Sequence, residues 1–259
     1  MRRHGLAGEL RDPARPVTAH RRHTPAGHGV APHAHPRAQL LLILSGVMRI
    51  EAGPDTWIVP PGHAAWIPGG LVHEVGGETE MAHCNIHFDP AIAAQARPEA
   101  QCVVLQASAL LREMAARLAE PGPLGSAEPP WQRLGLALVD EVARLAVSDL
   151  GLPGGHDPRL RRVTRHLMTH PAEPRGLPDL AAQAGSTERT LARLFPAETG
   201  MTFRQWRTRQ RMLLAMERLE RGESSGEVAA ALGYGSASAF IAAFRRAMGA
   251  APGQILRGG

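Results

Sequence analysis

The sequence contains no lysine, and arginine supplies all 29 of its basic side chains. It has only two cysteines, Cys84 and Cys102, which are too few for a disulfide framework and lack the paired spacing of a zinc finger. No apolar run is long enough for a secretory signal or a membrane span. These absences exclude a disulfide-stapled secreted scaffold, and they predict a protein of the reducing cytoplasm that makes no contact with the membrane.

Motifs of two large enzyme classes are missing as well. Without lysine the chain cannot hold a phosphate-binding P-loop, and it contains no HExxH metal helix. Carboxylates placed as a pair for acid–base chemistry are also absent. We therefore predict that the protein is not an enzyme, has no catalytic residue and requires no cofactor.

Positive charge is concentrated in the C-terminal part of the chain. Residues 157–259 contain 16 arginines and 9 acidic residues, whereas residues 1–156 contain 13 arginines and 15 acidic residues. The C-terminal part thus carries a net charge of +7 and the N-terminal part −2, which gives the +5 of the whole chain. Such a basic region predicts a polyanionic partner, because nucleic-acid phosphates supply most sequence-independent affinity.

Hydrophobic patterning predicts strands in the first part of the chain and helices after them. Short apolar runs between Gly and Pro predict the strands of a barrel or sandwich at Leu40–Leu44, Val47–Ile50, Trp57–Val59 and Ala64–Ile67. Leucines at helical spacing then predict two bridging helices, around Leu105–Leu118 and Trp131–Leu150. The apolar stripe of these helices suits packing on their own domain, and it also suits a dimer contact.

The C-terminal part contains an internal repeat. Reading forward by 49 residues pairs Leu191 with Phe240 and Phe195 with Phe244. Each copy consists of a helix, a glycine turn and a second helix, which is the helix-turn-helix pattern. In the first copy Ser186 is expected to cap the second helix. Between the copies, residues 202–221 predict one helix of about 30 Å, close to the roughly 34 Å of one turn of B-DNA. Such a connector can place both copies in successive major grooves.

From Asp157 to Arg257 the chain resembles the DNA-binding domain of the AraC/XylS family of bacterial regulators. The resemblance is carried by GSTERTLARLFPAETGMTFRQW, by the arginine-rich connector and by EVAAALGYGSASAFIAAFRRAMGAAPGQILR. Carried over by position, it implies that the residues facing the bases or the groove are Arg189, Ala192, Arg193, Ala237, Ser238, Ile241 and Ala242. One departure is Pro196, which we expect to fray or end the first recognition helix.

The two units offer different chemistry to DNA. Arg189 and Arg193 can each bind a guanine edge through two hydrogen bonds, whereas the second unit offers small and apolar groups. Base readout is therefore expected mostly in the first unit, although a solvated or phosphate-binding face is the alternative for both arginines. Contacts to phosphates are predicted for Arg207, Arg209, Arg211, Arg245 and Arg246.

Residues 28–90 resemble the two motifs of a cupin barrel. His33 and His35 share one face if that segment is extended, Gln39 continues the same register, and PPGHAAWIPGGLVH supplies His73. In cupin enzymes the corresponding residues bind a divalent metal, but Gln39 stands where those enzymes have glutamate, and an amide is a weaker ligand. The four residues are therefore predicted to line an effector pocket, with a divalent metal site or structural packing as alternatives.

A further histidine pair follows in the same region. If residues 81–88 form a strand, His83 and His87 share a face with Asn85, while Cys84 points to the other side. A metal site that uses Cys84 together with both histidines is then geometrically awkward. We take these histidines as ordinary strand residues.

Together these observations predict a multi-domain α+β protein with an N-terminal cupin-like β-barrel, bridging helices and a C-terminal all-α domain. The expected parts are a flexible arm (1–27), a sensor domain (28–105), bridging or dimerisation helices with a linker (106–156) and a DNA-binding domain with two helix-turn-helix units (157–259). The predicted function is sequence-specific transcriptional regulation in response to a small-molecule effector. A metal-responsive regulator is one alternative, and a metal-dependent cupin enzyme with a DNA-binding appendage is another. Expected partners are double-stranded DNA, the effector, a second copy in a homodimer and, for an activator, RNA polymerase.

Overall fold

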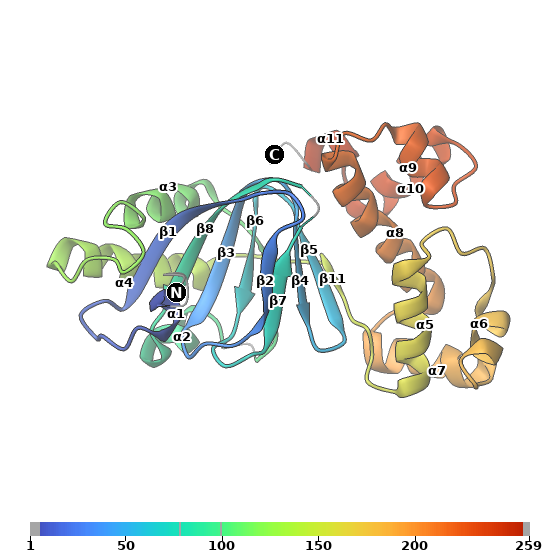
Figure 1. Ribbon diagram of the computed structural model, residues 1–259, viewed down its shortest axis with the longest axis horizontal. Coiled ribbons are helices and arrows are strands. Elements are labelled where there is room, and N and C mark those ends of the chain that lie inside the picture. The colour runs from blue at the N-terminus through green and yellow to red at the C-terminus, as the bar shows by residue number, and fades with distance from the viewer. Residues whose placement is uncertain (1–5, 78, 99, 256–259) are drawn as a thin grey trace. The chain divides into compact units, whose positions relative to one another are not determined.

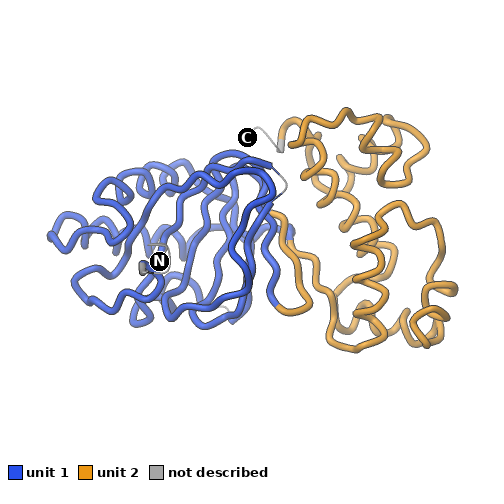
Figure 2. The backbone as a smooth tube through the Cα atoms, in the orientation of Figure 1, with its two compact units in different colours: residues 1–52, 59–150, 258 blue, residues 53–58, 151–257, 259 orange. Residues whose placement is uncertain are grey.

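The computed structural model describes residues 6–77, 79–98 and 100–255, which divide into two compact units (Figure 2). The first unit contains the chain up to Ala52 and Val59–Leu150, and the second contains Gly53–Ile58 and the chain from Gly151 onward. Residues 53–58 belong to the second unit because strand β11 (Gly151–Leu152) pairs with strand β5 (Asp55–Val59).

Two antiparallel sheets form the N-terminal part of the fold (Figure 1). One has the strand order β1-β8-β3-β6-β9-β10 and the other the order β11-β5-β4-β7-β2. The remaining strand bounds are β1 (Val17–Thr24), β2 (Gly29–His33), β3 (Ala38–Ser45), β4 (Met48–Ala52), β6 (His63–Ile67), β7 (His73–Gly76), β8 (Met81–Phe88), β9 (Val103–Gln106) and β10 (Val147–Ser148). This arrangement confirms the predicted cupin-like β architecture and each of the four predicted strands.

The central strands of the six-stranded sheet, β3, β6 and β8, are buried on both faces. The outer face of this sheet packs against helices α2 (Pro90–Ala96), α3 (Ala109–Leu118) and α4 (Pro129–Arg144). The shared apolar core contains Leu40, Leu42, Trp66, Ile86, Phe88, Leu111, Leu138 and Val142. Because side chains alternate between the two faces, the next residues along these strands point to the opposite side, between the sheets. Burial on both faces explains why β3 is a continuous apolar run in the sequence.

The N-terminal segment differs from the predicted flexible arm. Residues 17–24 form β1, which pairs with β8 along its whole length. The fully buried Arg37 holds the residues before β1 in place. Its Nε donates to the Leu10 carbonyl and one Nη donates to the Arg15 carbonyl, each at 2.8 Å. The same side chain pairs with Asp89 at 3.2 Å. The prediction was wrong over this stretch because β1 is rich in Arg and His and lacks the apolar run of a typical strand. Its apolar residues, Val17 and Ala19, face the helices.

The bridging helices also differ from their predicted bounds. The first begins at Ala109 instead of Leu105, because Ser108 caps it by accepting the Leu111 N–H at 2.9 Å, and Val103–Gln106 pair with β6. The second ends at Arg144 instead of Leu150, and Val147–Ser148 pair with β9. Val103–Gln106 and Val147–Ser148, which were predicted at least in part to be helical, are strands of the six-stranded sheet instead. Sheet pairing therefore outweighs their helical spacing.

The second unit is helical from Pro158 to Ile255. Its helices are α5 (Pro158–Thr169), α6 (Leu177–Gln183), α7 (Glu188–Thr199), α8 (Phe203–Glu220), α9 (Ser225–Ala231), α10 (Ala237–Met248) and α11 (Pro252–Ile255). The bounds of α7 and α10 differ by 49 residues at both ends, and left-handed glycines, Gly200 and Gly249, follow them. The structure therefore confirms the predicted repeat. Among the residues described, no helix is long and apolar enough to cross a membrane.

Candidate nucleic-acid interface and effector pocket

Helices α6 and α7 form the first helix-turn-helix. Gly185 makes the turn with φ of 65°, and the Ser186 N–H donates to the Ala181 carbonyl at 2.8 Å. The helix cap is Thr187, whose side chain accepts the Thr190 N–H at 3.2 Å. The prediction that Ser186 caps α7 was wrong by one residue, since Ser186 is used to close the turn and Thr187 is the last extended residue.

Helix α7 has a buried face and an open face. Leu191 and Phe195 are fully buried, whereas Arg189, Ala192 and Arg193 are exposed on the opposite side. The three residues predicted to face DNA in this unit are thus free of the protein core. This amphipathic pattern fixes which side of α7 is available to a partner.

Pro196 does not end α7, contrary to our expectation. The helix continues to Thr199, whose hydroxyl donates to the Phe195 carbonyl at 2.6 Å, and the Gly200 N–H donates to the Pro196 carbonyl at 3.1 Å. Proline has no N–H, so the Ala192 carbonyl lacks its helical donor. Because Pro196 is exposed, water can donate to this carbonyl instead. The helix therefore keeps three full turns.

Helices α9 and α10 form the second helix-turn-helix in the same way. The Ser236 side chain accepts the Ala239 N–H at 3.1 Å and caps α10, in the repeat position of Thr187. Phe240 and Phe244 are fully buried. The predicted groove residues divide into exposed Ser238 and Ala242 and half-buried Ala237 and Ile241. Before Arg245, the open face of α10 has no long polar side chain.

Helix α8 connects the two helix-turn-helix units (Figure 1). Its 18 residues span about 27 Å, close to the predicted 30 Å. A capping box between Thr202 and Gln205 defines its first turn. The helix is also part of the core, because Trp206 and Gln210 are buried and the Gln210 side-chain amide donates to the Leu167 carbonyl at 2.8 Å.

The five arginines predicted to bind phosphates lie in different surroundings. Arg245 and Arg246 are exposed on α10. In contrast, Arg207 donates to the Arg175 carbonyl at 2.8 Å, and Arg211 donates to the Pro171 carbonyl at 3.1 Å. The Arg211 guanidinium also lies 5.6 Å from the centre of the Tyr234 ring. Arg209 is half-buried on α8. Arg207 and Arg211 thus already hold the loop before α6 against α8.

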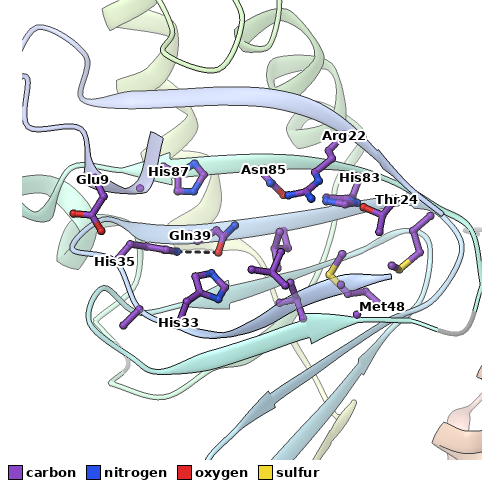
Figure 3. Close-up of a pocket in the computed structure, with 18 residues that line it drawn as sticks. Glu9, Arg22, Thr24, His33, His35, Gln39, Met48, His83, Asn85 and His87 are labelled. Atoms are coloured by element: carbon purple, nitrogen blue, oxygen red, sulfur yellow. Dashed lines mark hydrogen bonds between the residues drawn. The ribbon is translucent and has the colours of Figure 1, made fainter. Parts of the chain in front are cut away.

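A cavity of about 250 Å³ lies between the two sheets and is lined by residues of the first unit (Figure 3). The six-stranded sheet lines it with residues of β1, β3 and β8, and the other sheet with residues of β2, β4 and β7. Glu9 of α1 (Leu6–Glu9) lies at its edge. Met48 and Val75 supply apolar lining, and His33, His35, His83 and His87 supply imidazole rings. A cavity of this size and polarity suits a small ligand.

The structure brings together all four predicted pocket residues. His33, His35 and Gln39 line the cavity, and the His35 Nε2 lies 3.2 Å from the Gln39 Oε1. The His73 ring packs against them, with its centre 4.4 Å from that of His33 and 5.3 Å from that of His35. Strand alternation was the reason to expect His33 and His35 on the same side. Both line the cavity, but only His33 is in β2, and His35 lies in the loop after it.

Several lining residues were not predicted. His83, Asn85 and His87 of β8 share one face, as expected for a strand, but that face is the wall of the cavity. Arg22 and Thr24 of β1 line the same wall. The sequence did contain a signal for this wall. Polar residues alternate along β8 with Cys84, Ile86 and Phe88, which pack into the apolar core, so the polar residues must face the other side.

Burial keeps His73, His83 and His87 neutral. Desolvation lowers the pKa of His73 to about 4 and, together with the charge of Arg22, that of His83 to about 4. Burial also lowers the pKa of His87 well below its usual value, and the neighbouring His35 and His20 act in the same direction. A neutral imidazole offers one N–H donor and one lone pair, so these three histidines bind through hydrogen bonds or coordination rather than through charge.

Two family models match the chain. A model of the AraC-like ligand binding domain matches residues 15–134, and a model of a helix-turn-helix domain matches residues 180–258. The first match contains all the cavity-lining residues except Gly8 and Glu9, and the second covers α7 to α10.

Similar proteins were also found among curated sequences and solved structures. The HTH-type transcriptional regulator NimR of Escherichia coli (strain K12) is 34% identical over 224 residues, which are 86% of this chain and 81% of NimR. The DNA-binding domain of AdpA in complex with a target DNA is 34% identical, covers 39% of this chain and 92% of that chain, and has a TM-score of 0.36. Fatty acid-bound ToxT of Vibrio cholerae is 10% identical over 95% of this chain and 97% of its own, with a TM-score of 0.39.

Proposed function

Because this chain belongs to the AraC/XylS family of transcriptional regulators, with a ligand-binding domain before a helix-turn-helix domain, we propose that α7 and α10 contact the bases of its operator. The observation that carries this proposal is the open face of α7, where Arg189 and Arg193 are exposed one turn apart. Regulation of transcription through DNA binding was predicted from the sequence, and the relationship to NimR confirms it.

The two recognition helices have different roles in this proposal. Each α7 guanidinium can donate two hydrogen bonds to the O6 and N7 atoms of a guanine, so α7 supplies most of the sequence preference. Helix α10 presents Ala237, Ser238, Ile241 and Ala242, which suit close fit and contact with thymine methyl groups. Exposed Arg245 and Arg246 at the end of α10 bind phosphates and position the helix.

The cavity of the first unit is the proposed effector site. Its support is the cavity of about 250 Å³, which is lined mostly by the part of the chain that matches the AraC-like ligand binding domain. The mixed lining, which includes apolar Met48 and Val75 and polar His35, Asn85 and His87, favours a small ligand with both polar and apolar groups. Binding of this ligand changes operator affinity.

Exchange of Arg193 tests the base-contacting role of α7. We expect Arg193→Ala to weaken discrimination between the operator and a variant site by about 1–3 kcal/mol, because a bidentate guanine contact is lost. Footprinting and binding titrations with the full-length protein measure this, with Arg165→Ala on the exposed side of α5 as the control. Unchanged discrimination in Arg193→Ala would exclude α7 as the main reader.

The wider predictions about partners and catalysis have separate support. We infer that the chain acts as a regulator and not as an enzyme, since NimR, to which it is similar over 86% of its length, is a transcriptional regulator. Homodimerisation through α3 and α4 stays a prediction, favoured by the exposed Leu110 and Leu136 on these helices. Contact with RNA polymerase also stays a prediction, for the case that the protein activates transcription.

A further inference from the structure

The segment between β11 and α5, residues 153–157, is bound to the helices that follow it. The Trp206 Nε1 of α8 donates to the Pro153 carbonyl at 2.7 Å, and the Thr164 hydroxyl of α5 donates to the Gly154 carbonyl at 2.8 Å. Both donor side chains are buried. A connection rich in glycine is usually flexible, but here side chains of the helices hold its backbone groups.

Glu198, in the last turn of recognition helix α7, holds the other end of this segment. One of its carboxylate oxygens accepts the His156 N–H at 2.6 Å and the Asp157 N–H at 2.9 Å. Gly155 permits this close approach, because it has φ of 78° and an added Cβ would lie 2.4 Å from the Leu160 side chain. The segment therefore has partners on α5, α7 and α8.

The position of Glu198 benefits the segment and not α7 itself. A carboxylate in the last turn of a helix is unfavourable for that helix, because the macrodipole makes this end negative. The same carboxylate is favourable just before the first turn of α5, where the helix end is positive. In the second helix-turn-helix, Ala247 occupies the same place in the repeat and is exposed. The helix-turn-helix fold therefore does not require Glu198, and its contacts indicate that it holds residues 153–157.

The same segment is also joined to the sheet that lines the cavity. The Gly154 N–H donates to the Asp55 side chain of β5 at 2.9 Å. Directly before it, β11 pairs with β5, with Leu152 opposite Thr56. Residues 53–58 thus belong to the same compact unit as the helices (Figure 2). Strand β5 is in turn the neighbour of β4 in the sheet that contributes residues of β2, β4 and β7 to the cavity.

We propose that residues 153–157 couple the cavity to recognition helix α7, with Glu198 and Trp206 as the positioning residues that hold this segment. The inference rests on the proposed function, in which the cavity binds the effector and α7 reads the operator. A displacement of β5 reaches the helices through a segment whose backbone is bonded, whereas a flexible linker would absorb it. Coupling between two sites is reciprocal, so operator binding at α7 also changes the stability of β5.

Hydrogen exchange of the full-length protein tests the coupling without knowledge of the effector. The probe is a DNA duplex that contains the footprinted operator. In the wild type, we expect operator binding to slow amide exchange in residues 53–59 by about threefold or more. Glu198→Ala should abolish this response and retain operator preference. Glu198→Gln should keep the response, since its amide oxygen can accept the same two N–H groups.

A second measurement needs no DNA. In the free protein, Glu198→Ala should speed exchange of the His156 and Asp157 amides by about tenfold or more, because they lose their acceptor. Thr164→Val is the second variant if Glu198→Ala does not fold. It keeps the shape of the side chain, removes the hydrogen bond to the Gly154 carbonyl, and should abolish the same operator response.

Glu227→Ala is the matched control, because its carboxylate also accepts a backbone N–H at the start of a helix, that of Ser224 at 2.8 Å. It should leave exchange in residues 53–59 and 153–157 as in the wild type. If the wild type prefers its operator but shows no response in residues 53–59, the coupling is overturned. An unchanged response in Glu198→Ala, or loss of operator preference in that variant, overturns it as well. Absence of operator preference in the wild type refutes the proposed function instead, whereas unchanged exchange of free Glu198→Ala refutes only this inference.

Discussion

His83 lies on β8 with its side chain on the wall of the cavity, beside Arg22. Its environment penalises the protonated ring, whereas in the unfolded chain the ring titrates near its ordinary pKa of about 6.5. Below that pH the unfolded state therefore binds more protons than the folded state, and protonation favours unfolding. Above it, His83 is neutral in both states and contributes no pH dependence. The same reasoning applies to each buried pocket histidine whose pKa is lowered.

We predict that the first unit loses stability as the pH falls from 6.5 towards 4. With a folded-state pKa of about 4, His83 alone lowers the free energy of unfolding by about 2 kcal/mol between pH 7 and pH 5. Urea unfolding of the wild type and of His83→Gln at both pH values measures this contribution. The difference between pH 7 and pH 5 should be smaller in His83→Gln by that amount. His28→Gln, on the exposed loop, is the control, and an unchanged difference in His83→Gln would contradict the prediction.

Individual elements differ in how far their sequence determines them. The apolar runs of β3 to β6 and the helical spacing of α7 and α10 predict these elements because burial dominates their composition. Strands β1 and β2 escape prediction, since their inward positions carry the polar residues of the cavity and their sequences resemble loop. Helix ends at Arg144 and Ala109 depend on pairing partners far along the chain. The convergence of His33, His35 and His73 likewise depends on a strand pairing that local periodicity does not encode.

The proline in α7 gives a prediction at the scale of the helix. Pro196 lacks the N–H that would bond to the Ala192 carbonyl, and the helix is continuous around it. Replacement with alanine restores this hydrogen bond without changing the open face, so Pro196→Ala should raise the free energy of unfolding by about 1–3 kcal/mol. Thermal unfolding of the full-length protein is the measurement.

The repeat supplies a matched control for this exchange. Arg245 occupies the place of Pro196 in α10, 49 residues later, and it is an exposed helix former. Arg245→Ala should therefore change the unfolding free energy by no more than about 0.5 kcal/mol. A loss of stability in Pro196→Ala would mean that the proline ring makes a favourable contact, and the account of α7 would need revision.

At the scale of the whole molecule, charge separates the two parts of the chain. The +7 of residues 157–259 predicted a nucleic-acid partner from composition alone, and the relationship to NimR confirms it. Composition does not show which arginines are available, because Arg207 and Arg211 bind carbonyl groups of the loop before α6. Only the folded structure distinguishes arginines that hold the protein together from those that are open to a partner such as Arg246.

The salt dependence of operator binding distinguishes these two groups of arginines. Each phosphate neutralised by the protein releases counterions. The negative slope of log K against log salt concentration therefore becomes shallower by roughly 0.9 for each lost contact. Arg246→Ala should therefore reduce the slope by about 1 and weaken specific and non-specific DNA alike. Arg211→Ala should leave the slope unchanged and instead lower the thermal stability, because its guanidinium holds the Pro171 carbonyl and the Tyr234 ring. A reduced slope in Arg211→Ala would show that this side chain leaves its carbonyl partner for a phosphate, as the sequence-based prediction has it.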